Sequence, residues 1–148
     1  MKIVVSACLL GEKCKYNGGC NYSDAVAEFV KGREVIPVCP EVKAGLGVPR
    51  IPVEIVNGVV KDKNGNSVDD CLRKAVAEIL AELEKEPIEC VILKSRSPTC
   101  GVKQVYDGTF SGKLIDGMGV LAEALQKAGY QVIDSEDVCN FEKEKVCK

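Results

Sequence analysis

Short apolar runs alternate with longer amphipathic stretches along most of the chain. Four runs of four to six residues stop at Gly, Pro or polar positions, which is typical of buried parallel strands; they cover residues 2–7, 34–38, 90–94 and 130–133. Helix-compatible patterns separate them at residues 25–30, 68–85 and 119–128. This order predicts a mostly parallel sheet with right-handed crossover connections.

Capping and turn residues mark several element boundaries. Ser23 is a predicted N-cap for the first helix. Ser67 and Asp70 form a capping-box variant before the long amphipathic helix over residues 68–85. Asn57-Gly58 lies between two short apolar runs, a pattern that predicts a two-residue hairpin.

The expected fold class is therefore α/β. We expect a three-layer fold with a mostly parallel sheet of about four strands plus a small β-hairpin insertion. A chain of 148 residues is the size of one compact domain. We therefore expect a single domain over residues 1–148, in which residues 137–148 form a peripheral tail.

The amino-acid composition limits the cellular locations and the binding partners that we expect for this protein. The sequence is 46% hydrophobic and 28% charged, near the average for globular proteins. It has neither a long apolar span nor a signal-peptide pattern, so we expect a cytoplasmic protein without a membrane partner. A formal net charge of −2 argues against sequence-independent binding to nucleic acid. Nothing in the sequence specifies an oligomeric state.

Cysteine and histidine usage carries the most chemical information. There are nine Cys and no His. A Ser-His-Asp triad, a Cys-His dyad and a His-ligated metal are therefore excluded within this chain. Any general acid or base must be Glu, Asp, Lys, Tyr, Cys or water. An odd number of cysteines at this density also argues against a disulfide framework.

Three of the cysteines follow three predicted strands. Cys8 comes after the first strand, Cys39 after the second and Cys100 in the loop after the third. Ligand sites in such folds lie beyond the carboxyl ends of the strands, so we expect these thiols to meet at one site. Three thiolates without a fourth protein ligand favour an iron–sulfur cluster with one open iron, which would act as a Lewis acid. Structural zinc is the alternative, but the C-x-x-C spacing is missing.

The other cysteines have different interpretations. Cys14 and Cys20 remain open as substitute ligands, or as members of a redox disulfide among Cys8, Cys14 and Cys20. Cys71 and Cys90 fall in a helix and a strand, where packing is the expected role. The last two, Cys139 and Cys147, belong to the charged tail.

Two polar residues near these thiols are candidates for chemistry. Glu41 follows Cys39 by two positions and is the best candidate acid or base; the ordinary alternative is a solvated loop carboxylate. Ser97 precedes Cys100 by three positions, where it either hydrogen-bonds substrate or caps the local turn.

Two glycine-rich segments suggest anion binding. Backbone N–H groups of residues 108–112 and 117–119 are expected to face an anion near the start of the last helix. Four cations are expected near the same edge or as solvated surface charges: Arg50, Lys94, Arg96 and Lys103. These features define one alternative, an anion-binding regulatory protein whose cysteines are merely buried.

Five ordered motifs span the chain up to about residue 136: Ser6-Ala7-Cys8-Leu9-Leu10-Gly11, Pro37-Val38-Cys39-Pro40-Glu41, Pro49-Arg50, Leu93-Lys94-Ser95-Arg96-Ser97-Pro98-Thr99-Cys100-Gly101 and Tyr106-Asp107-Gly108-Thr109-Phe110-Ser111-Gly112. Together they resemble the thiouracil desulfidase family, long catalogued as a domain of unknown function. The departures from the family pattern are Lys15-Tyr16-Asn17-Gly18 for Arg-Tyr-Asp-Gly, Ala44 for a frequent Gly and Thr99 for a common Ser.

The resemblance implies an enzyme. By it, Cys8, Cys39 and Cys100 correspond to the ligands of a 4Fe-4S cluster, and Glu41 and Ser97 to the catalytic residues. The implied reaction converts a thiolated pyrimidine, thiouracil or a thiouridine nucleotide, to the oxo form with release of sulfide. A non-catalytic metal or cluster-binding module remains an alternative, because the same cysteines would suffice for it.

Overall fold

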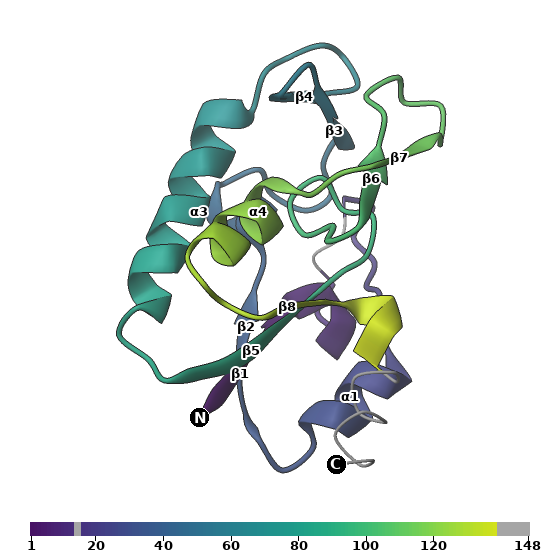
Figure 1. The fold of residues 1–148 in the computed structure, drawn as a ribbon. Coiled ribbons are helices and arrows are strands. Elements are labelled where there is room, and N and C mark those ends of the chain that lie inside the picture. The colour runs from purple at the N-terminus through teal and green to yellow at the C-terminus, as the bar shows by residue number, and fades with distance from the viewer. Residues whose placement is uncertain (14–15, 139–148) are drawn as a thin grey trace.

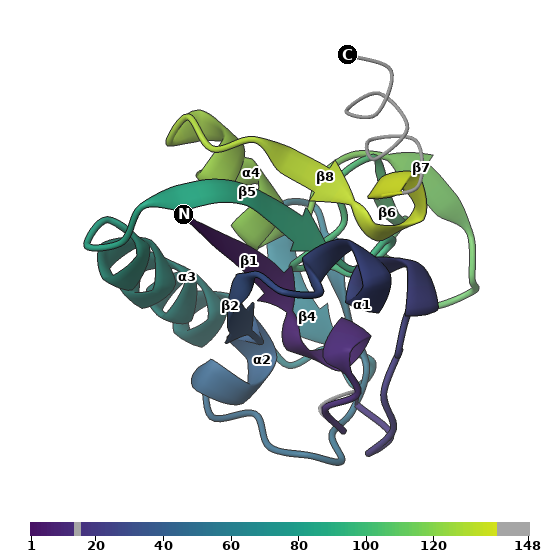
Figure 2. The same cartoon turned by 90° about the horizontal axis from the view of Figure 1, so that it is seen from below.

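The main sheet of the computed structural model, which describes residues 1–13 and 16–138, has four parallel strands in the order β2-β1-β5-β8 (Figure 2). They are β1 (Lys2–Ser6), β2 (Glu34–Val38), β5 (Ile88–Leu93) and β8 (Val132–Asp134). The predicted α/β class with about four parallel strands is confirmed. The last two strands differ by two residues or so from their predicted starts, as strand ends often do.

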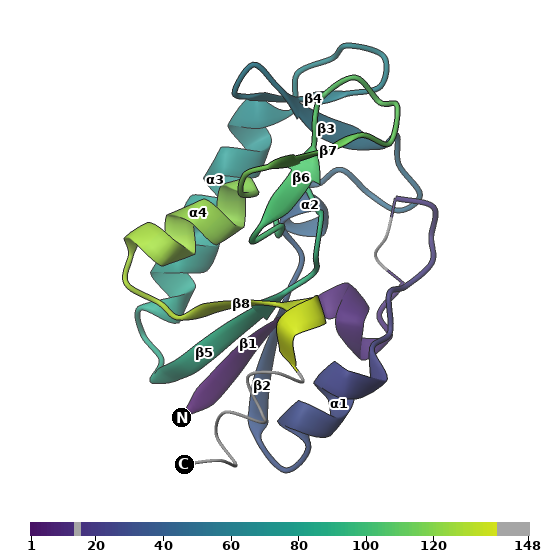
Figure 3. The ribbon, with the colours of Figure 1, turned by 45° about the vertical axis from the view of Figure 1, so that its right-hand side comes forward.

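Helices cover both faces of this sheet. Helices α3 (Asp69–Leu83) and α4 (Val120–Lys127) lie on one face, and α1 (Asp24–Val30) lies on the other (Figure 3). Successive strand residues point to opposite faces. Val4 and Leu93 therefore pack with α3 and α4, whereas Val5 and Ile92 pack with α1. Cys90 belongs to the α1-side core, which confirms its packing role.

Two local predictions are confirmed by backbone geometry. The Ser23 side chain accepts a hydrogen bond from the Val26 N–H at 3.2 Å and caps α1. Asn57 and Gly58, with φ of 50° and 81°, join β3 (Val53–Val56) to β4 (Val59–Asp62) in an antiparallel hairpin. Positive φ at both central residues is what the right-handed strand twist requires of a two-residue turn.

The predicted capping box before α3 is wrong. The N-cap is Val68, which has no side chain able to accept a hydrogen bond, and Ser67 and Asp70 do not form the reciprocal pair. Instead the Asp69 carboxylate accepts the Val60 N–H at 3.0 Å. The start of α3 is thus held in two ways: the Ser67 hydroxyl accepts the Asp69 N–H at 3.4 Å, and the contact of Asp69 with Val60 ties the helix to β4.

Two shorter elements are not predicted by the sequence pattern. A second hairpin, β6 (Gln104–Tyr106) with β7 (Leu114–Asp116), flanks the glycine-rich segment 108–112, and α2 (Pro40–Lys43) follows β2. Three-residue strands are too short to show a period. Both hairpins lie at the same end of the molecule (Figure 1). No helix within the described residues is long and apolar enough to cross a membrane; the predicted tail lies almost wholly outside them.

Candidate functional site

A pocket of about 520 Å³ opens at the carboxyl ends of β1, β2 and β5. Its size is typical of small-molecule sites. Strands β1 and β5 are neighbours, but the chain leaves β1 towards β2 and leaves β5 towards β8. Such a switch point leaves a crevice in a doubly wound sheet. The pocket therefore sits where this architecture places its ligands.

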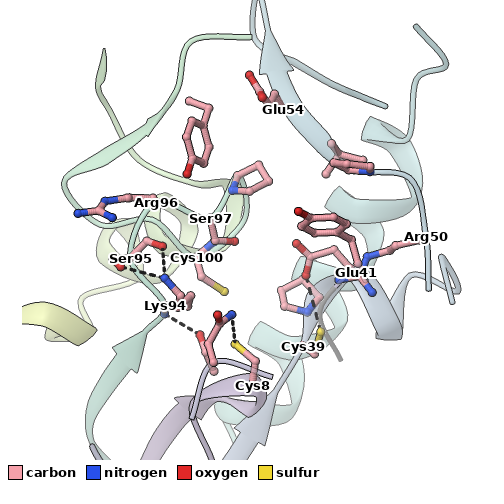
Figure 4. Close-up of a pocket in the computed structure, with 18 of the residues that line it drawn as sticks. Cys8, Cys39, Glu41, Arg50, Glu54, Lys94, Ser95, Arg96, Ser97 and Cys100 are labelled. Carbon is pink, nitrogen blue, oxygen red and sulfur yellow. Dashed lines mark hydrogen bonds between the residues drawn. The ribbon is translucent and has the colours of Figure 1, made fainter. Parts of the chain in front are cut away.

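The pocket brings together the five residues singled out in the sequence. Cys8 lies in a 3-10 helix (Ala7–Leu10) directly after β1, and Cys39 is the N-cap of α2 directly after β2. Cys100 lies in the loop after β5, and Glu41 and Ser97 line the same space. The three thiols converge from three different segments, with Glu41 beside Cys39 (Figure 4).

Ser97 organises the loop that carries Cys100. Its hydroxyl oxygen accepts the N–H groups of Thr99 at 3.2 Å and Cys100 at 3.1 Å, and its carbonyl accepts the Gly101 N–H at 2.8 Å. Of the two interpretations of Ser97, the cap of the local turn is therefore observed. Ser97 also lines the pocket, so the second interpretation, a hydrogen bond to substrate, stays a prediction.

Helix α4 begins against this loop. The N–H groups of Gly119, Val120 and Leu121 donate to carbonyls of residues 98–101 at 2.8–3.1 Å. A Cβ at Gly119 would lie 2.4 Å from the Thr99 carbonyl carbon, so only glycine permits this approach. The expected anion site at the start of the helix is wrong, because the protein's own carbonyls already occupy these donors.

The other glycine-rich segment binds a carboxylate of the protein itself. Glu54, 8% exposed on β3, accepts the N–H groups of Gly108 at 2.9 Å and Phe110 at 3.2 Å. Phe110 has φ of 57°, a left-handed conformation that is strained for a bulky residue. Glu54 thus fixes the β6–β7 loop against β3, on the side of the pocket away from the thiols (Figure 4).

Sequence reasoning missed Glu54. The available indication was one carboxylate inside the apolar run of residues 53–56, where a strand side chain is expected to be half-buried. Together with Tyr106 and Phe110, which also line the pocket, Glu54 forms what we call the roof. The thiol-bearing end, with Cys8, Cys39 and Cys100, is the floor.

Glu41 is a buried carboxylate. It is only 8% exposed, so the alternative of a solvated loop carboxylate is wrong. Its Oε1 accepts a hydrogen bond from the Thr99 hydroxyl at 2.8 Å, and its Oε2 lies 3.7 Å from the donating Cys39 Sγ. Thr99, which is fully buried, was noted in the sequence only as a departure from the family pattern.

The surroundings of Cys100 oppose the loss of its proton. Burial, which is the largest cause, and the nearby Glu41 carboxylate together raise the pKa of this thiol to about 12, against weaker lowering by hydrogen bonds with Ser6 and Thr99. At neutral pH the thiol stays protonated until a cation offsets that cost. A bound metal centre supplies such a charge.

Three of the four predicted cations lie at the pocket. Arg50, Lys94 and Arg96 line it, whereas Lys103 is exposed and pairs with Asp137 at 3.1 Å. The Lys94 ammonium donates to the Ser95 carbonyl at 3.0 Å and the Ser95 hydroxyl at 3.1 Å. The pocket therefore combines soft sulfur donors with buried carboxylates and cations on its walls.

Three thiols, without a fourth cysteine among the described residues that line the pocket, are a donor set of the kind that holds an iron–sulfur cluster. A single zinc needs all its ligands within about 2.3 Å of one point, whereas thiolates of a cluster bind different irons. Cys20 is exposed and does not line the pocket; Cys14 lies outside the described residues.

Fold and pocket together define a doubly wound α/β protein with a three-cysteine site at its switch point. A sequence profile of the 2-thiouracil desulfurase family matches residues 3–137, and the chain belongs to this family. The resemblance predicted from the motifs is confirmed, and with it the class of enzyme.

Two similar proteins support this assignment. The uncharacterized protein YbbK of Bacillus subtilis (strain 168) is 37% identical over 146 residues, covering 92% of this chain and 97% of YbbK. A solved structure described as the [4Fe-4S]-dependent thiouracil desulfidase TudS superposes with a TM-score of 0.87 at 30% identity, covering 99% of each chain. The shared fold thus extends over nearly the whole chain.

Proposed function

We propose that this protein is an iron–sulfur-dependent desulfidase that converts a thiolated pyrimidine, thiouracil or a thiouridine nucleotide, to the oxo form with release of sulfide. The observation that carries the proposal is the meeting of three thiols and a buried carboxylate in one pocket. Membership of the 2-thiouracil desulfurase family supports the same reaction.

Cys8, Cys39 and Cys100 would hold a 4Fe-4S cluster, the cofactor named for the solved relative. When bound, a cluster with three protein ligands supplies an iron with an open position, a Lewis acid suited to the sulfur of a thiocarbonyl. The predicted cofactor thus agrees with the solved relative and with the donor set of the pocket.

The residues of the chain supply the proton chemistry. Glu41 takes a proton from the water that attacks the thiocarbonyl carbon, while Ser97 orients the water or the substrate. The C–S bond breaks, a C–O bond replaces it and sulfur departs as sulfide, so water is the only co-reactant and no electrons are exchanged. Tyr106 and Phe110 in the roof offer apolar surface to a planar ring.

The setting of the reaction follows from the same features. The proposed enzyme works as one domain in the cytoplasm, where thiols stay reduced. Its substrate is a small molecule, because the net charge of −2 gives little attraction to a nucleic-acid backbone.

A Glu41→Gln variant tests the proposal. Native and variant protein are reconstituted with iron and sulfide without oxygen, and the disappearance of 2- and 4-thiouracil is followed beside sulfide release. We expect turnover to fall by about 10²–10⁴-fold in the variant with unchanged iron content. Glu84→Gln, on the exposed end of α3, serves as the control. Equal turnover in native protein and Glu41→Gln would exclude the catalytic role of Glu41. Native protein that holds its cluster but turns over neither thiouracil would instead favour a non-catalytic cluster module.

A further inference from the structure

We propose that Thr99 is a positioning residue that joins Ser97 and Glu41 into one hydrogen-bonded unit. The inference rests on the proposed function, since it concerns the two residues to which that function assigns the proton chemistry. Thr99 is fully buried, and its hydroxyl lies 2.8 Å from Glu41 Oε1, 3.1 Å from Ser97 Oγ and 3.7 Å from Cys100 Sγ.

The direction of these hydrogen bonds follows from the supply of protons. A threonine hydroxyl has one proton to donate. The shortest contact is to the Glu41 carboxylate, and hydrogen bonds to a charged acceptor are the stronger ones. Thr99 therefore donates to Glu41 and is left with its lone pairs for other partners.

Ser97 completes the unit. Its oxygen already accepts the backbone N–H groups of Thr99 and Cys100, which uses its acceptor capacity. Without a ligand in the pocket, its own proton therefore goes to Thr99 Oγ1, 3.1 Å away; rotation of the same hydroxyl turns this proton towards water or substrate when one is bound. The hydroxyl of Ser97 donates to Thr99, and the hydroxyl of Thr99 donates to Glu41. Both hydroxyl protons of this hydrogen-bonded series therefore point towards the Glu41 carboxylate.

This arrangement divides the work between the two oxygens of Glu41. Oε1 is fixed by Thr99, whereas Oε2 accepts the Cys39 thiol at 3.7 Å. Cys39 would hold the cluster as a thiolate with no proton to donate, and Oε2 would then be the oxygen that accepts a proton from water. Ser97 at the pocket wall is oriented from behind by the same hydroxyl. Without the Thr99 hydroxyl, Glu41 and Ser97 would each lose the hydrogen bond that orients their side chains.

Two substitutions of Thr99 separate the effect of its hydroxyl from the effect of its side-chain shape. Thr99→Val keeps the branched shape and removes the hydroxyl, whereas Thr99→Ser keeps the hydroxyl and removes a methyl group. We expect Thr99→Val to lower kcat by about tenfold or more, the rate equivalent of one charge-assisted hydrogen bond, with KM within about twofold. Thr99→Ser is expected to stay within about threefold of the native kcat, since it restores the same bonds.

A double substitution tests whether Ser97 and Thr99 act as a unit. Residues that work together show losses that do not add. We expect Ser97→Ala with Thr99→Val to lose little more activity than Ser97→Ala alone. If the fold-losses in kcat of the two single variants multiplied in the double variant, Ser97 and Thr99 would act independently, which would overturn the proposal. Iron and sulfide content are measured for every variant, so that a loss of the cluster is not mistaken for a loss of positioning.

A crystal structure of each variant gives a readout without turnover. We expect the Glu41 carboxylate to leave its position in Thr99→Val and to keep it in Thr99→Ser. If Thr99→Val does not fold, Thr99→Ala removes the hydroxyl without filling its place. An unmoved Glu41 with native kcat would overturn the proposal. Native protein that is inactive on thiopyrimidines would instead refute the proposed function, while the position of Glu41 would still decide the role of Thr99.

Discussion

The two ends of the main sheet are built from the same strands but hold their polar groups differently. At the amino ends, Lys2 pairs with Glu86 at 2.6 Å, and Arg33 pairs with Glu89 at 2.8 Å. These side chains are about one-third exposed. Exposed ion pairs of this kind add little to stability, because water already solvates the charges well.

The carboxyl ends hold polar groups away from water. Glu41 and Thr99 are buried there, and Cys100 is 4% exposed with a raised thiol pKa. Burying such groups costs free energy unless each one finds a partner. Polar burial thus distinguishes the carboxyl ends of the strands from the amino ends. We expect substitutions at the carboxyl ends to change iron binding or turnover, and substitutions at the amino ends to change stability alone.

The largest effect is expected from the floor thiols. Cys8→Ala, Cys39→Ala and Cys100→Ala should each lose most of the iron that the reconstituted native protein binds, about four irons with four acid-labile sulfides per chain. Cys90→Ala, a buried thiol in the α1-side core, is the matched control and should keep its iron despite a lower stability. Full iron in any of the three floor variants would remove that residue from the ligand set.

A smaller effect is expected from Gly119→Ala, which pushes α4 away from the Cys100 loop. The new Cβ would meet the Thr99 backbone at 2.4 Å, and backbone atoms cannot give way as a flexible side chain can. We expect a loss of about 1–3 kcal/mol in the free energy of unfolding, measured by urea titration, together with weaker retention of iron. Gly129→Ala, which meets no atom within 4 Å but has φ of 95°, is the comparison for backbone strain without a clash. Equal iron retention in both variants would show that the contact does not position Cys100.

Glu54→Gln is expected to alter the roof and leave the floor intact. An amide oxygen accepts the Gly108 and Phe110 N–H groups less strongly than a carboxylate, at a cost of about 1 kcal/mol in stability. We expect KM for thiouracil to rise by severalfold, with little change in kcat or iron content. If KM stayed native while kcat fell, Glu54 would act on the reaction and not on the loop that carries Phe110.

The smallest effect is expected from Lys2→Met at the amino ends. The hydrogen bond that the Lys2 ammonium donates to the Glu86 carboxylate raises the pKa of Lys2 above its usual 10.5. A raised lysine pKa stabilises the folded state below the unfolded pKa, and this contribution disappears as pH rises through the folded value. The melting temperature should fall by a few degrees at most at neutral pH and match the native protein in strong alkali, with unchanged turnover. A loss of turnover would contradict the separation of the two ends.

Much of the fold was predictable because its indications are local. Apolar runs marked all four parallel strands, and Asn57-Gly58 marked the first hairpin. The predicted capping box was wrong because α3 begins one residue later than expected, with Val68 as its N-cap, and no local pattern reveals the contact of Asp69 with Val60, nine residues away. The second hairpin was not predicted because its strands are held by pairing with each other and have no periodic sequence of their own.

The α/β class, the family and the position of three cysteines after three strands could all be predicted from residue patterns, because strand order and parallel direction place those cysteines at one edge. The surroundings of the cysteines depend on the three-dimensional fold. The burial of Glu41, the hydroxyl of Thr99 between Glu41 and Ser97, and the hold of Glu54 on the roof join residues up to 58 positions apart. Hydrogen bonds of that kind depend on distances in space, which a pattern along the chain does not contain.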